Sequence, residues 1–157
     1  MTIDEIIDFV ANLDGVLTLS PTASDEWPEI SWGDTFFYYS PDGVIPTNTQ
    51  PFATIVTKDY PDEPSSQLTR PNTFRVNIAA GKEAFTNWIG RAPRQAATDV
   101  DYSVTDTVIP HPTYSSAGWL AVVNPGTHTD APTRELLQTA YHRARARYER
   151  RAESDDR

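Results

Sequence analysis

The amino-acid sequence predicts an α+β fold, with an antiparallel sheet of about five to six strands backed by N-terminal and C-terminal helices. The residue pattern changes along the chain in the order helix, several short strands, short helix, two strands and long helix. Short strands separated by turn residues are typical of hairpin-linked antiparallel sheets rather than of parallel, doubly wound ones. We expect residues 1–151 to form a single domain and residues 152–157 to be a frayed tail.

The first predicted element is a helix near the start of the chain. Thr2 and Glu5 fit a capping box, in which each side chain accepts a hydrogen bond from the other residue's backbone N–H. Gly15 suits the left-handed conformation that often follows a helix, so the helix is expected to end at Asp14. The predicted apolar face of this helix comprises Ile3, Ile6, Ile7, Val10 and Leu13.

The middle of the chain is rich in strand-forming residues. Strand patterns cover residues 16–20, 30–39, 51–58 and 73–79. Gly33 and Asp34 would split the second of these into a hairpin or form a bulge within it. In the fourth, Arg75 and Asn77 alternate with apolar residues, which predicts a half-buried strand that turns these two polar side chains outward.

Residue patterns also predict a long loop and a short helix in the middle of the chain. Residues 59–71 form the longest predicted loop, with three prolines and three acidic residues, and we interpret it as an excursion able to act as a flap. Residues 81–89 predict a short helix that ends at Gly90. Its inward-facing residues are expected to be Phe85, Trp88 and Ile89.

The segment from Val108 to Pro125 reads VIPHPTYSSAGWLAVVNP and concentrates rigid and aromatic residues. His111 lies between Pro110 and Pro112. Each proline fixes its own φ and favours an extended conformation of the residue before it. The His111 imidazole is therefore expected on a stiff backbone, followed by a turn at residues 115–118 and a buried apolar strand at residues 119–123.

The formal net charge of −9 is unevenly distributed along the chain. Residues 1–64 contain 12 Asp and Glu and one Lys, whereas residues 65–157 contain 10 Asp and Glu and 12 Lys and Arg. An acidic half of this kind repels phosphate backbones, so nucleic acid is not an expected partner. The long helix expected from Asp130 carries six arginines, which we expect to pair with the acidic half: Arg134, Arg143, Arg145, Arg147, Arg150 and Arg151.

Composition and motifs narrow the classes of function. The chain has no cysteine, which excludes disulfides, thiolate catalysis and cysteine-based metal sites. His111, His128 and His142 are not at metal-ligand spacing, and no glycine-rich phosphate loop or hydrolase motif is present. We therefore expect neither a metal nor a cofactor. Because no apolar run of about 18 residues and no signal peptide is visible, a cytoplasmic protein without a membrane partner is expected.

Three stretches together resemble a known family. They are RPNTFRVNIAAG (residues 70–81), VIPHPTYSSAGWLAVVNP (residues 108–125) and LLQTAYHRARAR (residues 136–147). They resemble the DUF6194 family over nearly the whole chain, and that resemblance implies no established activity. The opening helix ending in LDGV (residues 13–16) and the late Gly-Trp strand followed by a helix are similar, more weakly, to the MmcQ/YjbR-like proteins. This second similarity implies a compact α+β fold, for which a DNA-binding role has been suggested.

The first functional hypothesis is a ligand-binding or regulatory domain whose partner is a small molecule or a protein. Its site is expected where the Pro-His-Pro segment meets the polar face of the 73–79 strand, with some members of the aromatic set around it (Trp32, Phe36, Tyr38, Trp88, Tyr114, Trp119). The candidate ligand-binding residues are Arg70, Arg75, Asn77, His111, Tyr114 and Trp119. Two alternatives stay open: nucleic-acid binding through the arginine-rich C-terminal helix, and a small-molecule enzyme with His111 as general base.

Overall fold

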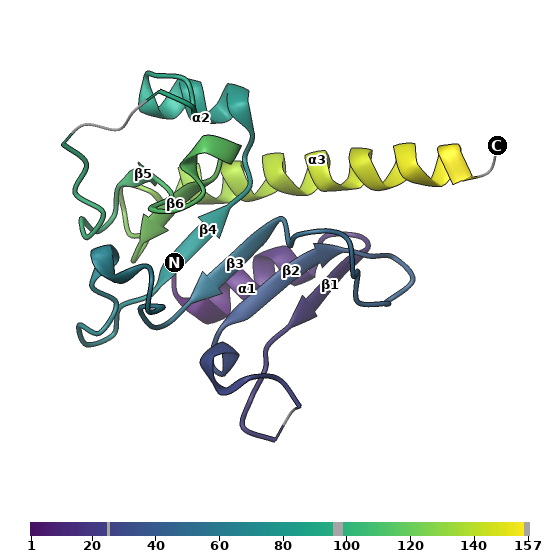
Figure 1. Ribbon diagram of the computed structural model, residues 1–157, viewed down its shortest axis with the longest axis horizontal. Coiled ribbons are helices and arrows are strands. Elements are labelled where there is room, and N and C mark those ends of the chain that lie inside the picture. The colour runs from purple at the N-terminus through teal and green to yellow at the C-terminus, as the bar shows by residue number, and fades with distance from the viewer. Residues whose placement is uncertain (25, 96–98, 156–157) are drawn as a thin grey trace.

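A computed structural model describes residues 1–24, 26–95 and 99–155. The helices and strands are α1 (Ile3–Ala11), β1 (Val16–Leu19), β2 (Thr35–Tyr39), β3 (Ala53–Val56), β4 (Arg75–Ile78), α2 (Lys82–Ile89), β5 (Val108–Pro110), β6 (Leu120–Val123) and α3 (Asp130–Asp155). Three short 3-10 turns are η1 (Glu29–Ser31), η2 (Pro64–Ser66) and η3 (Ser115–Ala117). The strands form a single antiparallel sheet in the order β1-β2-β3-β4-β6-β5, so the predicted α+β class is confirmed (Figure 1).

The first helix begins at a capping box and ends at Ala11, with Asn12 as its C-cap, so it stops three residues before the predicted end at Asp14. Thr2 Oγ1 accepts a hydrogen bond from the Glu5 N–H, and Glu5 Oε1 accepts one from the Thr2 N–H, so the predicted capping box is present. Gly15 has a positive φ of 79° and turns the chain into β1. The two fully buried residues of α1, Ile6 and Val10, pack against the sheet.

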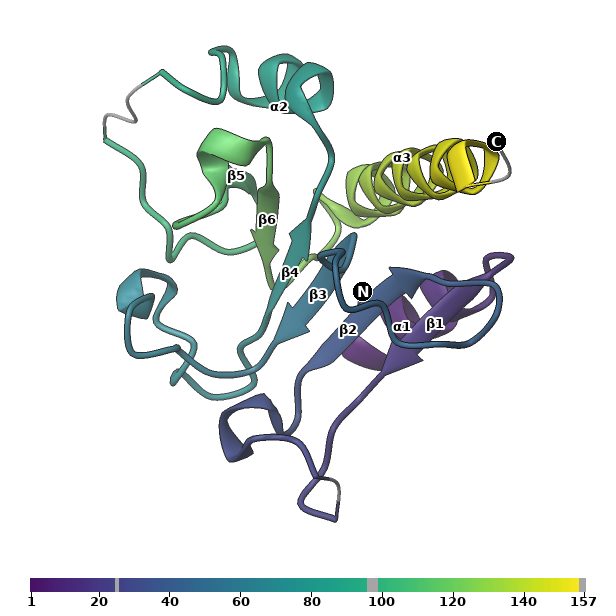
Figure 2. The ribbon, with the colours of Figure 1, turned by 45° about the vertical axis from the view of Figure 1, so that its right-hand side comes forward.

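The hydrophobic core lies on the face of the sheet that α1 and α3 cover. Figure 1 views the sheet from the opposite face, which we call the open face, with α1 behind the strands. In Figure 2, η2 and η3 lie on one side of β4 and β6, and α3 lies on the other. The largest fully buried side chains of the core come from four strands and three helices: Ile6, Val10, Phe37, Ile55, Val76, Ile78, Phe85, Leu120, Val122, Leu136 and Leu137.

The structure corrects three details of the sequence prediction. Residues 29–31 form η1 rather than a strand, and β2 begins only at Thr35. This happens because Asp34 is fully buried and accepts hydrogen bonds from Thr57, Lys58 and Tyr60, which fixes a turn before β2. Trp88, expected to face inward, is 44% exposed. The strand predicted as half-buried, β4, is buried on both faces.

The last helix is longer than expected. Residues 152–157 were predicted to fray, yet α3 continues through Asp155, and residues 156 and 157 lie outside the described part of the chain. None of the helices in the described ranges is long and apolar enough to cross a membrane.

Candidate functional site

A row of side chains crosses the open face of the sheet. The strand register pairs Phe36 with Thr54, Thr54 with Asn77, Asn77 with Ala121, and Ala121 with Ile109. Side chains of adjacent residues in a strand point to opposite faces, so these five residues point away from the helices. The three members from β2, β3 and β4 form the floor of a cavity.

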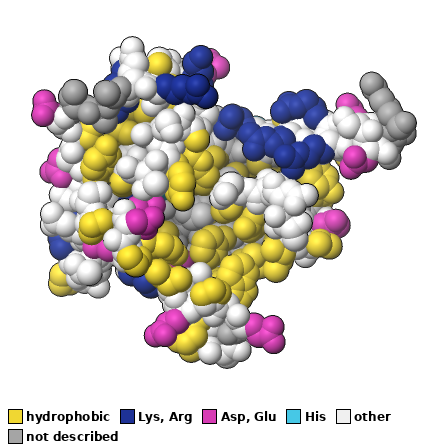
Figure 3. Space-filling model, in the orientation of Figure 1, with side chains coloured by type: hydrophobic (Ala, Val, Ile, Leu, Met, Phe, Trp, Pro, Cys, Tyr) yellow, Lys and Arg dark blue, Asp and Glu magenta, His cyan; other side chains and the backbone are white. Residues whose placement is uncertain are grey.

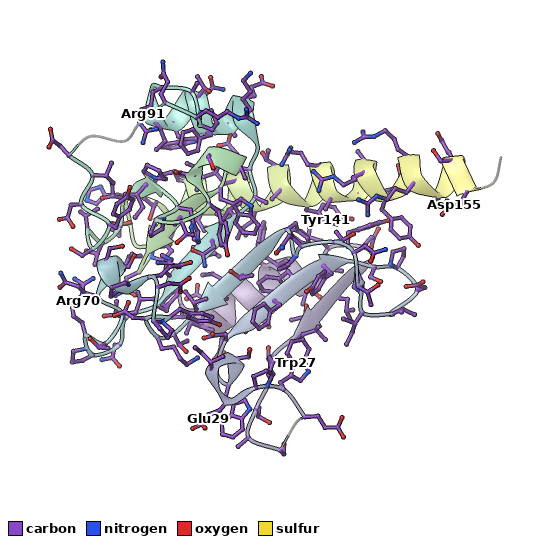
Figure 4. The ribbon with its side chains drawn as sticks, viewed as in Figure 1. Trp27, Glu29, Arg70, Arg91, Tyr141 and Asp155 are labelled. Carbon is purple, nitrogen blue, oxygen red and sulfur yellow. The ribbon has the colours of Figure 1, made fainter. Side chains whose placement is uncertain are left out.

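This cavity, which we call the sheet-face cavity, has a volume of about 570 Å³. Figure 3 shows the same face in space-filling form, with hydrophobic side chains gathered across it. Its aromatic wall comprises Trp27, Phe36, Tyr38, Tyr60, Tyr114 and Trp119. Trp27, labelled in Figure 4 in the connection before β2, stacks on Phe36 with 6.0 Å between ring centroids and 15° between planes. The wall is therefore built from flat, apolar surfaces with a few polar groups between them.

Five of the six candidate ligand-binding residues line this one cavity. They are Arg75, Asn77, His111, Tyr114 and Trp119. Arg70 does not line it, because its guanidinium donates hydrogen bonds to the carbonyl oxygens of Ser66, Gln67 and Ser103. Figure 4 shows Arg70 at the edge of the molecule. The structure therefore brings together the residues of β4, the Pro-His-Pro segment and the start of β6, and gives Arg70 a role in holding the loop.

A buried polar network occupies the β4 side of the cavity. Arg75 Nη2 donates to Glu63 Oε1 at 2.7 Å, its Nη1 donates to Ser66 Oγ at 2.9 Å, and its Nε donates to Asn77 Oδ1 at 2.7 Å. Asn77 Nδ2 in turn donates to Thr54 Oγ1 at 3.0 Å. The Arg75 and Glu63 side chains are only 3% and 12% exposed. These bonds use three of the five N–H groups of the guanidinium.

The 59–71 segment, predicted to be a flap, forms a wall of the cavity. Its Glu63 and Ser66 hold Arg75, and its Leu68 packs with Val56 and Val123 in a second, smaller hydrophobic cluster. Tyr60 donates a hydrogen bond to the buried Asp34, and burial together with this bond raises the pKa of Tyr60. These contacts attach the segment to the open face at several points, and its role as a flap stays a prediction.

His111 is held in one protonation state and one orientation. The backbone N–H of His111 donates to the Trp119 carbonyl oxygen. The ring Nδ1 accepts hydrogen bonds from the backbone N–H groups of Thr113 and Tyr114, both at 3.0 Å. Burial lowers the pKa of His111 to about 3, and the positive charge of Arg75 acts in the same direction. The ring is therefore neutral at physiological pH and carries its proton on Nε2, which makes it a hydrogen-bond donor.

The sequence reasoning missed several cavity residues. Glu63 and Tyr60 were assigned only to a loop, and Trp27 only to a polar connection. Trp27 carried a usable signal, because a tryptophan between acidic residues in a polar segment needs an apolar surface to cover it. Two aromatic residues named from the sequence lie elsewhere: Trp88 is exposed, and Trp32 donates from Nε1 to the Trp27 carbonyl oxygen.

Gly118 positions the cavity wall, because it connects η3 to Trp119 with a φ of +84°. A Cβ at this position would lie 2.9 Å from the backbone carbon of Gly81. We expect Gly118→Ala to lower the free energy of unfolding by about 1–3 kcal/mol, measured by urea denaturation. The matched control is Gly90→Ala, since Gly90 has a φ of +82° but nothing within 4 Å of its added Cβ. Equal losses in the two variants would show that the close approach to Gly81 has no effect.

Within the described ranges, no group of three or more His, Cys, Asp or Glu side chains is placed to hold a metal ion.

Comparison with protein families matches residues 1–153 to a family described as "Family of unknown function (DUF6194)". The chain belongs to the DUF6194 family. The DUF6194 match covers every residue of the sheet-face cavity. No curated protein and no solved structure matches, so the weaker similarity to MmcQ/YjbR-like proteins has no support from these comparisons.

Proposed function

We propose that this DUF6194 chain binds a small molecule with a planar ring in the sheet-face cavity. The observation that supports this function is the convergence of six aromatic side chains and a few buried polar groups on one cavity of about 570 Å³. Apolar, aromatic walls with a small number of fixed polar groups are typical of small-molecule sites. Cavities of roughly 300–1,000 Å³ are the usual size for such ligands.

The polar groups of the cavity define the chemistry of the ligand. The ring of His111 offers an Nε2–H donor, and Arg75 retains two N–H donors beyond its contacts within the protein. The exposed Tyr114 ring and the Trp119 ring lie 6.3 Å apart at the mouth and provide surfaces on which a flat ligand stacks. The ligand is therefore a planar ring that carries hydrogen-bond acceptors, such as ring nitrogens or carbonyl oxygens.

Ala117 provides the test, because it is exposed, belongs to η3 and lines the cavity. We expect Ala117→Trp to fill the mouth and weaken binding of a planar ligand by more than about tenfold. Native mass spectrometry of the purified protein and a thermal-shift screen of planar heterocycles identify the ligand, and titration calorimetry compares its affinity for the variants. The matched control is Ser116→Trp in the same turn, since Ser116 does not line the cavity. Equal affinity of both variants for the ligand would contradict the proposed location.

Catalysis by His111 as general base has less support than binding. A general base needs a nitrogen lone pair directed at the substrate, whereas the Nδ1 lone pair of His111 already accepts hydrogen bonds from two backbone N–H groups.

Nucleic-acid binding through α3 has one supporting observation. Contrary to the sequence prediction, no arginine of α3 forms an ion pair with a carboxylate of residues 1–64 in the described part of the chain. The similarity to MmcQ/YjbR-like proteins and their suggested DNA-binding role stays an expectation beside this alternative.

A further inference from the structure

A second cavity, which we call the arginine groove, lies next to the sheet-face cavity. It has a volume of about 250 Å³ and lies between α3 and the segment that leads into β3. Arg143, Arg147 and Arg151 line it at intervals of four residues, so they share one face of the helix. Figure 3 shows Lys and Arg side chains gathered along α3, beside the hydrophobic side chains of the open face.

Among the residues that the structure describes, none is an acidic partner of these three arginines. No Asp or Glu lines the groove, and the only arginine of α3 with an ion pair in the described part of the chain is Arg145, which pairs with Glu149. Arg143 donates to the Ala79 carbonyl oxygen and Arg151 to Thr49 Oγ1, both of them neutral acceptors. Burial and the neighbouring charge of Arg147 lower the pKa of Arg143. Like charges four residues apart on a helix destabilise it, and a bound anion would relieve that repulsion.

The groove and the sheet-face cavity adjoin each other. Four residues line both of them: Gln50, Pro51, Ala117 and Trp119. A ligand that stacks its ring on Trp119 therefore has a path to the guanidinium groups without leaving the protein surface. Guanidinium groups are planar forks that match the oxygens of a phosphate.

We propose that the arginine groove binds the phosphate group of a small molecule whose planar ring lies in the sheet-face cavity. This inference rests on the proposed function and adds the class of ligand, a phosphorylated planar compound such as a mononucleotide. A small phosphate ester needs only the local positive charge of three arginines. A nucleic-acid strand would also meet the long-range repulsion of a chain whose net charge is −9.

The experiment compares matched pairs of probes that differ only in phosphate. Adenosine with adenosine monophosphate, guanosine with guanosine monophosphate, and riboflavin with flavin mononucleotide are titrated into the full chain by calorimetry at low ionic strength. We expect the phosphorylated member of the binding pair to bind at least about tenfold more tightly. The difference should shrink as the salt concentration rises, because salt screens exposed charges.

Two α3 variants locate the phosphate. Arg147→Gln is expected to remove most of the difference between the members of a pair, because Arg147 lines the groove and makes no recorded hydrogen bond or ion pair within the described part of the chain. The matched control is Arg150→Gln, which removes the same charge from the same helix but lines neither the groove nor the sheet-face cavity. Equal effects of the two variants would indicate only a general charge effect and would overturn the proposed site.

The possible failures can be told apart. Equal binding of both members of a pair overturns the phosphate site and leaves the ring site in place. Binding of inorganic phosphate as tight as that of any phosphorylated ring compound, with no gain in affinity from the ring, overturns the ring site and hence the composite ligand. Tighter binding of a single-stranded oligonucleotide than of any mononucleotide overturns the inference in favour of a nucleic-acid partner. No binding of any probe, with no compound retained by the purified protein, overturns both proposals.

Discussion

Replacing Arg75 with alanine is expected to lower the free energy of unfolding by about 3–5 kcal/mol. The Arg75 side chain is only 3% exposed, and its guanidinium makes bonds of 2.7–2.9 Å to Glu63, Ser66 and Asn77. Its removal leaves a largely buried carboxylate without a counter-ion and two buried acceptors without a donor. Breaking a buried ion pair from one side has this cost because the remaining charge is still desolvated. Urea denaturation followed by circular dichroism measures the loss.

A double-variant cycle separates the ion pair from a general loss of packing. Arg75→Met keeps much of the side-chain volume, and Glu63→Gln removes the opposite charge. We expect the loss in free energy of unfolding of the double variant to be roughly 1–3 kcal/mol smaller than the sum of the two single losses. The reason is that neither charge is left without its partner in the double variant. Strict additivity would show that the Glu63–Arg75 pair does not couple. Arg145→Ala, which breaks the exposed pair with Glu149, is expected to leave stability almost unchanged.

Lowering the pH from 7 to 4 is expected to destabilise the protein through His111. The pKa of this residue is about 3 in the folded chain and about 6.5 when unperturbed, so the unfolded chain binds the proton first as the pH falls. The stabilising contribution is therefore complete above about pH 6.5 and is lost as the pH falls toward 3. At about 1.4 kcal/mol for each pKa unit, the loss between pH 7 and pH 4 is about 3 kcal/mol. Denaturation curves across this range measure it.

The non-titrating variant His111→Asn isolates this contribution. Asparagine Oδ1 replaces the imidazole Nδ1 as the acceptor for the Thr113 and Tyr114 N–H groups, so the local turn is retained. We expect the variant to lose about 3 kcal/mol less than the natural chain over the same pH interval. Nitrogen chemical shifts of the His111 ring should report the Nε2-protonated neutral form above pH 5. A ring that gains its proton near pH 6.5 in the folded protein would contradict the argument.

Patterns within single elements predicted the fold well. The capping box of Thr2 and Glu5 and the alternation around Arg75 and Asn77 depend on residues a few positions apart, and both are present as predicted. The burial of Arg75 was not predictable in this way, because it depends on Glu63 and Ser66 folding over β4 from a separate segment. Alternation shows which face a side chain takes but not what covers that face.

The difference between local patterns and contacts from separate segments also explains which parts of the candidate site could be predicted. The Pro-His-Pro segment and the β4 face were each visible in the sequence, and they meet because β6 pairs with both β4 and β5. Arg70 was predicted to join the same site, but its donors instead bind the carbonyl oxygens of Ser66, Gln67 and Ser103. The arginines of α3 were expected to neutralise the acidic half of the chain. The groove that they form with the segment before β3 depends on tertiary structure that no local pattern shows.

The two-sided sheet places core residues next to residues that line the sheet-face cavity. Phe37 and Ile55 point into the core, whereas the residues just before them, Phe36 and Thr54, point into the sheet-face cavity. Under the proposed function, substitutions at every second position of β2 and β3 would change ligand preference without repacking the interior. Sequence comparisons among DUF6194 members should then show two rates of amino-acid substitution at alternating positions of these strands. Positions that face the helices should change slowly, and positions that face the cavity should change faster.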